Sequence, residues 1–264
     1  MKLSRLLSLV GLTLLVAALV AVLPSQAKTD LTDKKIVGIW LFDDIKDDQA
    51  QDTSGNGLDG KLEGKVKVVD GKFGQALQFD GNSYVEIPFN ELLNIKHMTL
   101  MCWVHAEAAG AVQIHRWKPP AYTLEIFQGK TTPVIMTAGG FKYNQPPKPT
   151  PLNEWVHIAG TYDGKNLIAY QNGEAVDTLE HQGDIEAGTD VVRFGARTDN
   201  DGGKYQGVLD EVAIIGEALT QQEIQDIMNN GFESVLNPKP THIEFKNKLP
   251  AHWGKIKGNY IKKD

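Results

Sequence analysis

The strongest constraint on the fold is a repeated alternation of polar and apolar residues with a period of two, broken by turns that contain glycine. It is clearest in residues 74–88, where Leu77 and Phe79 lie two apart, as do Val85 and Ile87, with polar side chains between them. Successive side chains of a β-strand point to opposite faces, so this period places one face of each strand in a core. We predict a β-hairpin at 74–88 and an all-β fold of two packed antiparallel sheets that extends to about residue 215.

The other strands follow from the same pattern. Asn172-Gly173 separates two such runs and is the best two-residue hairpin signal in the chain, since a type I′ turn requires positive φ at both positions. Two stretches rich in proline, 116–120 and 139–151, are predicted as loops because proline cannot donate a hydrogen bond to a neighbouring strand. Besides the two halves of the 74–88 hairpin, the predicted strands are 36–42, 61–69, 98–106, 111–115, 122–127, 134–138, 155–162, 166–171, 174–179, 190–195 and 207–215.

One segment departs from the period of two. Thr220, with Glu223 three residues later, forms a capping box, and Gly231 is a typical helix stop. The sequence therefore predicts a single short helix near 220–229, packed on an edge of the sandwich.

The N-terminus reads as a targeting segment. Lys2 and Arg5 precede an uncharged and mostly apolar run at 6–23, and small residues follow up to Ala27. This order predicts a signal peptide at 1–27 that is cleaved after Ala27, with a polar lead-in at 28–35. The protein would then be secreted, extracellular or periplasmic, with no membrane span. Because the apolar run is long, an uncleaved membrane anchor is the alternative.

Charge is distributed unevenly along the chain. The formal net charge is −6, yet residues 237–264 hold seven Lys and only two acidic residues. We predict a basic, extended C-terminal tail at 232–264 without a core of its own. The body before it is strongly acidic, which argues against nucleic acid as a partner. Cys102 is the only cysteine, so an internal disulfide is excluded.

Eight short motifs occur in an order that resembles a known family. They are 37–43 (Val-Gly-Ile-Trp-Leu-Phe-Asp), 52–60, 71–81, 98–104, 155–164, 170–173, 193–195 and 207–215. Together they resemble a bacterial laminin-G-like domain of the concanavalin A-like lectin/glucanase superfamily, over residues 36–231. The resemblance implies a two-sheet antiparallel jelly-roll β-sandwich that usually binds ligands without catalysing a reaction.

An oxygen-rich loop is a candidate metal site. Its spacing approximates an EF-hand loop, but β-type sequence flanks it, and an EF-hand requires helices. The resemblance instead implies a structural Ca²⁺ site closed by an acidic residue of the last strand, Asp210 or else Glu211. The alternative is a loop ordered by its own hydrogen bonds without an ion. The expected ligands are Asp52, Asn56, Asp59 and Asp210, with Ser54 beside them.

Glycoside hydrolysis is disfavoured by the sequence. Glucanases of this superfamily place their carboxylates as Glu-x-Asp-x-x-Glu or Glu-x-Asp-x-Glu on one strand, and neither spacing occurs here. The acidic pair Asp210-Glu211 is expected to point to opposite faces of its strand. We therefore expect no catalytic residues, and a hydrolase with an unrecognised carboxylate pair is the third hypothesis.

Aromatic residues in polar or proline-rich loops are the candidate ligand site. An exposed ring offers a flat apolar surface to a sugar, and neighbouring polar groups can bond its hydroxyls. The predicted ligand-binding residues are His115, Arg116, Trp117, Tyr143, Asn144, Asn200 and Tyr205, with Phe141 in the same loop as Tyr143. The leading prediction is a lectin-like domain for carbohydrate or a cell-surface glycoconjugate. An extracellular adhesion module that binds protein is the alternative, and the rings could instead cap the open ends of the sandwich.

Overall fold

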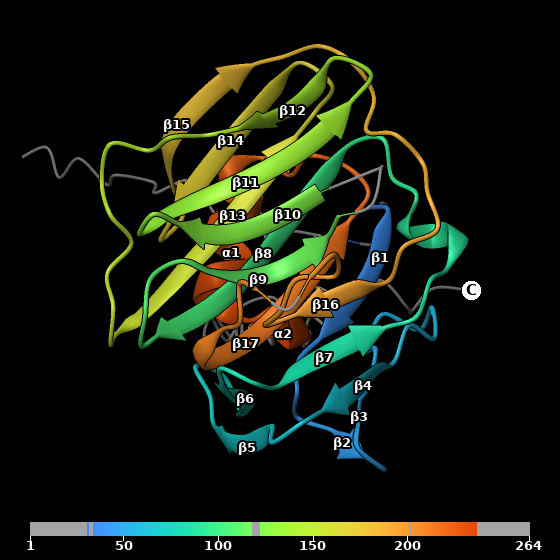
Figure 1. The fold of residues 1–264 in the computed structure, drawn as a ribbon, viewed down its shortest axis with the longest axis vertical. Coiled ribbons are helices and arrows are strands. Elements are labelled where there is room, and N and C mark those ends of the chain that lie inside the picture. The colour runs from blue at the N-terminus through green and yellow to red at the C-terminus, as the bar shows by residue number, and fades with distance from the viewer. Residues whose placement is uncertain (1–30, 32–33, 118–121, 201, 237–264) are drawn as a thin grey trace, which may run out of the picture.

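The computed structural model describes residues 31, 34–117, 122–200 and 202–236 as a sandwich of two antiparallel sheets (Figure 1). Sheet A has the order β15-β14-β13-β8-β17-β6-β5, with β1 also paired to β17. Its strands are β1 (Ile36–Trp40), β5 (Lys67–Asp70), β6 (Gln75–Asp80), β8 (Met98–Ala106), β13 (Trp155–Tyr162), β14 (Asn166–Gln171), β15 (Glu174–Glu180) and β17 (Gln206–Ile215).

Sheet B has the order β12-β11-β10-β9-β16-β7-β4-β3-β2. Its strands are β2 (Ile45–Lys46), β3 (Gln49–Ala50), β4 (Gly60–Glu63), β7 (Tyr84–Ile87), β9 (Ala111–Arg116), β10 (Tyr122–Phe127), β11 (Lys130–Thr137), β12 (Gly140–Tyr143) and β16 (Val192–Phe194). A 3-10 turn, Glu91–Leu93, connects β7 to β8. The prediction of two packed antiparallel sheets is confirmed.

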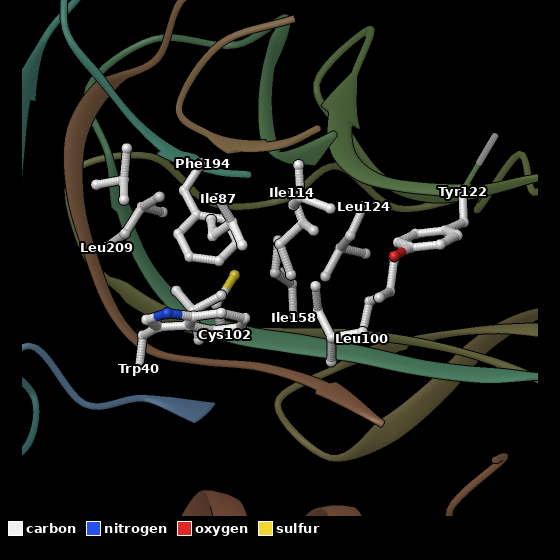
Figure 2. Packing of buried hydrophobic residues seen from close by; sticks show 14 of the residues in the cluster. Trp40, Ile87, Leu100, Cys102, Ile114, Tyr122, Leu124, Ile158, Phe194 and Leu209 are labelled. Carbon is white, nitrogen blue, oxygen red and sulfur yellow. The ribbon is translucent and has the colours of Figure 1, made fainter. Parts of the chain in front are cut away.

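The main core fills the space between the sheets (Figure 2). Ile114 and Leu124 of sheet B meet Leu100 and Ile158 of sheet A, and all four are fully buried. At one end, the ring of Trp40 packs edge-on against Phe194, with their centroids 4.9 Å apart. Strand β8 contributes every second residue to this layer, from Met98 to Ala106, which is the physical basis of the period of two in the sequence.

A second hydrophobic cluster covers the outer face of sheet A. Helices α1 (Gln221–Asn230) and α2 (Phe232–Leu236) lie there, on the side away from sheet B (Figure 1). The capping box between Thr220 and Glu223 is present, as predicted. The second helix was not predicted; Phe232 buries its ring in this cluster. No helix within the described residues is long and apolar enough to cross a membrane.

The predicted hairpin at 74–88 is wrong in its pairing. Its two halves are strands, but β6 pairs with β5 and β17 in sheet A, and β7 pairs with β4 and β16 in sheet B. The turn between them carries the chain from one sheet to the other. Alternation fixes which face of a strand is buried, but it does not identify the neighbouring strand. The hairpin at Asn172-Gly173 is confirmed, with φ of 50° and 75° at its two centres.

The predicted loop at 139–151 also contains a strand. Residues 140–143 form β12, which pairs with β11 at the edge of sheet B. The prolines of this stretch begin at Pro146, beyond the strand, so they do not prevent its pairing. The signal peptide predicted at 1–27 lies outside the described residues. The extended tail predicted at 232–264 begins instead with the helix α2, because Phe232 and Val235 bury their side chains, and its remainder from residue 237 lies outside the described residues.

Candidate functional site

The outer face of sheet B is not covered by the helices and carries several of the predicted ligand residues. Ile114 and Leu124 are cross-strand partners that point into the core, so the next partners, His115 and Thr123, point outward. The same alternation directs Phe141 and Tyr143 of β12 outward with Met136 and Val134 of β11. We name the following set the open face: His115, Trp117, Thr123, Glu125, Phe127, Phe141 and Tyr143.

Aromatic rings on the open face are in contact with one another. The ring of Trp117 stacks on His115, with centroids 5.5 Å apart, and on Phe141, with centroids 4.6 Å apart and planes 7° from parallel. Phe127 meets Tyr143 edge-on at 6.3 Å. Phe127, Phe141 and Tyr143 are each 43% exposed, and they are the large aromatic side chains most open to solvent in the described structure. These three rings therefore present the accessible apolar surface.

Thr198 fixes the orientation of His115 and Trp117. Its backbone N–H donates to His115 Nδ1 at 3.0 Å, and its hydroxyl accepts the backbone N–H of Trp117 at 3.1 Å. That hydroxyl in turn donates to Asp190 at 2.8 Å. Because Nδ1 of His115 accepts a hydrogen bond, the proton of the neutral ring is on Nε2. Burial, with Arg197 nearby, lowers the pKa of His115 to about 4, so the ring is neutral at physiological pH.

The two arginines beside the open face are each paired with a carboxylate. Arg197 bonds Asp199 at 2.9 Å, and its guanidinium lies 5.3 Å from the centre of the Trp117 ring. Arg193, the cross-strand partner of His115, bonds Glu86 at 2.8 Å. The guanidinium charges beside the open face are thus balanced by carboxylates.

Four predicted ligand residues do not belong to the open face. Arg116 is fully buried because its side chain points to the inner side, where it donates to the carbonyls of Leu93, Gly188 and Asp190 and to Asn94 Oδ1. Asn144 is buried and donates to Leu167 O of sheet A. Tyr205 belongs to the core, where its hydroxyl donates to Val208 O. Asn200 is exposed, but its side chain accepts the backbone N–H of Gly202.

Sequence reasoning missed part of this face. Thr123, Glu125 and Phe127 occupy the outward positions of β10, alternating with buried Leu124 and Ile126. The period of two already indicated that Phe127 is exposed, because it occupies an outward position of β10, where an aromatic side chain cannot reach the core. The prediction gave weight to loops instead. Trp117 and Tyr143 lie on this face, Tyr143 in a strand and not in the predicted loop, and their role in ligand binding stays a prediction.

The predicted metal ligands are not brought together. Asp52 accepts the backbone N–H groups of Ile39, Ser54 and Leu58 at 2.9–3.1 Å, and Asp59 accepts that of Asp52. Asn56 donates its amide to carbonyls of β1. Within the described ranges, no group of three or more His, Cys, Asp or Glu side chains could hold a metal ion. The four residues do not fit one Ca²⁺ site, and Ca²⁺ binding stays a prediction of the sequence.

Asp210 and Glu211 form a buried carboxyl pair in the middle of β17. Asp210 accepts the backbone N–H groups of Lys72 and Phe73, and Glu211 accepts that of Phe232. Burial raises the pKa of Asp210 to about 7 and that of Glu211 to about 8. These carboxyls hold neighbouring segments to the sheet. Glu211 has a φ of 52° at an irregularity of β17, so the pair does not alternate as a regular strand would.

Two hollows of the surface lie away from the open face. One is lined by Lys65, Lys67, Gln78, Phe79, Asp80, Glu107 and Gln206. The other is lined by Lys165, Asn166, Glu180, His181 and Gln182. Neither includes a predicted ligand residue, and both are polar and shallow, without an exposed aromatic ring. The open face is therefore the stronger candidate for ligand binding.

Comparison with known proteins agrees with the architecture. The family model Laminin_G_3, described as the concanavalin A-like lectin/glucanases superfamily, matches residues 79–225. No curated protein sequence matches the chain.

Among solved structures, domain 4 of AbnA, an extracellular arabinanase of Geobacillus stearothermophilus, is similar at TM-score 0.62 and 21% identity. The match covers 74% of this chain and 98% of that domain, which was solved in complex with arabinotriose. The binding domain of Paraclostridial Mosquitocidal Protein 1 is similar at TM-score 0.58 and 20% identity, over 74% of this chain and 52% of that chain. The binding domain of botulinum neurotoxin DC, in complex with rat synaptotagmin II, has TM-score 0.57 and 13% identity, over 74% and 51% of the two chains. At these identities the likeness shows the fold alone.

Proposed function

Because the chain belongs to the concanavalin A-like lectin/glucanases superfamily, we propose that it is a secreted, non-catalytic domain that binds carbohydrate through the open face of sheet B. The observation that carries this proposal is the group of exposed rings, Phe127, Phe141 and Tyr143, on one uncovered sheet. Such rings offer flat apolar surface to the C–H face of a sugar, and the polar groups beside them offer partners for its hydroxyls. The arabinotriose complex of a similarly folded domain supports this ligand class.

The direct test is a glycan array probed with residues 28–264, with and without Ca²⁺, followed by calorimetric titration of each glycan bound. We expect binding that Phe141→Ala weakens. Leu92→Ala is the matched control, since Leu92 is also a large apolar side chain exposed to solvent, at 41%. Absence of binding to every glycan, or equal weakening by both variants, would refute the proposal.

A non-catalytic role is proposed from the arrangement of the acidic residues. The one buried acidic pair of β17, Asp210 and Glu211, accepts backbone hydrogen bonds from Lys72, Phe73 and Phe232. A glycosidase needs two carboxyls that flank a bound glycosidic bond. The expected result is no release of reducing sugar from any glycan that the array identifies. Release that is lost on mutation of one acidic residue would overturn this part.

Binding of an extracellular protein is the second candidate. The same three exposed rings form apolar surface of the kind found at protein interfaces, and a similarly folded binding domain was solved with a protein partner. Competition separates the two candidates. Free oligosaccharide should displace the chain from a glycosylated surface if carbohydrate is the ligand, and enzymatic removal of glycans should abolish binding.

Secretion is proposed from the sequence at 1–27 alone. N-terminal sequencing of the protein expressed with its leader is expected to begin at Lys28. Full-length protein retained in the membrane fraction would indicate that the apolar run at 6–23 remains as an anchor instead.

A further inference from the structure

Buried polar groups without partners concentrate on two neighbouring strands of sheet B, β9 and β10. Among the described residues, eight buried side-chain nitrogen or oxygen atoms have no hydrogen-bond partner. Four of the eight belong to three residues of β9 and β10, namely both amide atoms of Gln113, Nε2 of His115 and the hydroxyl of Thr123. Folded proteins satisfy nearly all such groups, so a cluster of four on two neighbouring strands requires an explanation.

The cluster combines donors and acceptors in a fixed arrangement. His115 and Thr123 are directly opposite each other on adjacent strands, and both are fully buried. Since Thr198 donates to Nδ1 of His115, Nε2 of the neutral ring is a hydrogen-bond donor. The Thr123 hydroxyl can donate and accept, and Gln113, at the irregularity of β9, adds an amide that does both. Hydroxyl groups of a sugar have the same dual capacity.

The charges beside the cluster define which sugar fits. Arg197 is neutralised by Asp199, and Arg193 by Glu86. A carboxylate or sulfate on the ligand would need a guanidinium that is not already in an ion pair. The surroundings therefore favour an uncharged sugar over a uronic or sulfated one.

The ring of Trp117 covers one face of the His115 ring. It stacks on His115 and on Phe141, and Phe141 is 43% exposed. Trp117 follows β9 directly, and its backbone N–H donates to the hydroxyl of Thr198. Its side chain is joined to the surface through ring contacts, which a ligand stacking on Phe141 would replace.

We propose that Gln113, His115 and Thr123 form the polar floor of a concealed subsite for one uncharged sugar residue, reached when the bound glycan shifts the Trp117 ring from His115. This inference rests on the proposed function and names the ligand class and the residues that select it. The unpartnered groups lower the stability of the free protein, because each was removed from water without a replacement partner. Binding of the sugar supplies those partners.

The test uses the substitution Thr123→Val, which removes the unpartnered hydroxyl and keeps the shape of the side chain. Thr131→Val is the matched control, since the equally buried Thr131 hydroxyl bonds Thr150 at 2.9 Å. Each protein, as residues 28–264, is melted and then titrated with arabinotriose and with neutral trisaccharides of glucose, xylose, galactose and mannose. A galacturonic acid trisaccharide is the charged comparison.

We expect the melting temperature of Thr123→Val to equal or exceed that of the wild type, and its affinity for the neutral ligand to fall about tenfold. Thr131→Val should melt at a lower temperature and bind as the wild type does. The ligand should also change tryptophan fluorescence, and Trp117→Phe should remove that change.

The outcomes separate this inference from the proposed function. If the wild type binds no saccharide, the proposed function fails and the subsite falls with it. If the wild type binds a neutral trisaccharide and Thr123→Val binds it equally well, the subsite alone is refuted. A lower melting temperature of Thr123→Val also refutes it, because the hydroxyl then has a partner in the free protein. Preference for the galacturonic acid trisaccharide contradicts the assignment of an uncharged sugar.

Discussion

The outer faces of the two sheets have opposite chemistry, although both belong to one sandwich. On sheet A, Met101, Ala159 and Ala213 point outward into a second hydrophobic cluster, which α1 and α2 seal. On sheet B, the outward positions carry exposed rings and unpartnered polar groups with no helix above them (Figure 1). A sheet needs only one buried face to form a core. The covered face of sheet A thus adds buried apolar area, and the outer face of sheet B is the face proposed for binding.

Each face also holds one buried histidine, and the two differ in their surroundings. His157 on sheet A is 1% exposed and packs edge-on against Trp103, with centroids 5.3 Å apart. His115 on sheet B is stacked against Trp117, whose ring also contacts Phe141 and the guanidinium of Arg197. Each ring has one buried nitrogen without a hydrogen-bond partner, Nδ1 in His157 and Nε2 in His115. The difference is that His157 belongs to the sheet whose outer face carries the helices, and His115 belongs to the candidate binding face. The following predictions test whether the division between the faces is real.

The largest effect is expected on the covered face. Phe232→Ala should lower the free energy of unfolding by about 3–5 kcal/mol, because the buried ring leaves a cavity between α2 and sheet A. Urea denaturation followed by circular dichroism measures this change. Ligand affinity of the folded variant, measured at low temperature, should remain that of the wild type. Loss of binding by the folded variant would show that the two faces are coupled.

Acid should destabilise both faces through their histidines. Burial lowers the pKa of His157 to about 3, and burial with Arg197 nearby lowers that of His115 to about 4. The unfolded chain takes up these protons below about pH 6.5, while the folded protein does not. The two histidines alone should therefore lower the free energy of unfolding by about 1.4 kcal/mol per pH unit each as the pH decreases from about 6.5 to 4. The raised pKa values of Asp210 and Glu211 act in the opposite direction over this range, because the folded protein then holds protons that the unfolded chain has released.

The substitution His157→Phe separates the contribution of sheet A. It keeps a ring against Trp103 and removes the titrating group. The contribution of one histidine, about 1.4 kcal/mol per pH unit, should therefore be lost from the slope of the free energy of unfolding against pH. Denaturant unfolding at intervals between pH 4 and 7 measures the slope. An unchanged slope in His157→Phe would mean that the imidazole is protonated within the folded protein.

A smaller effect on stability, with a clear effect on binding, is expected on the open face. Phe141→Ala with Tyr143→Ala should change the free energy of unfolding by no more than about 0.5 kcal/mol per site, since both rings are half exposed. Affinity for the glycan identified on the array should fall about tenfold or more, because the stacking surface is lost. Strong destabilisation without loss of binding would reverse the roles assigned to the two faces.

The sequence predicted which face of each strand is buried better than it predicted which strands pair with each other. Alternation around Leu77 and Phe79 placed these residues in the core correctly, because burial is a property of each strand alone. The pairing of 74–80 with 84–87 was wrong, since a turn of the same composition can join two strands of one sheet or carry the chain between sheets. At Asn172-Gly173 the pairing was right, because a two-residue turn leaves the chain no room to change sheets.

The candidate site was only partly predictable, for a related reason. Trp117 and Tyr143 were named as aromatic residues in polar or proline-rich loops, and His115 as a polar neighbour able to bond sugar hydroxyls. Arg116 was named with them, yet it is the inward neighbour of His115, and strand parity assigns it to the other side. Tyr205 could not be excluded in this way, because its burial depends on packing against Phe79, which is distant in the chain.

The smallest effect is expected from Ca²⁺. The loop at 52–59 lies against β1, where the amide of Asn56 bonds two carbonyls, while Asp210 of β17 bonds Lys72 and Phe73. Both carboxylate oxygens of Asp52 already accept backbone N–H groups, which order the loop as an ion would. We therefore expect EDTA or 1 mM Ca²⁺ to shift the melting temperature by less than about 1 °C, whereas a bound ion at a hundred times its Kd would add about 2.7 kcal/mol. A rise of several degrees with Ca²⁺ that Asp210→Ala abolishes would instead establish a Ca²⁺ ion that bridges the loop and β17. The stability of the sandwich would then depend on a metal ion as well as on the covered face of sheet A.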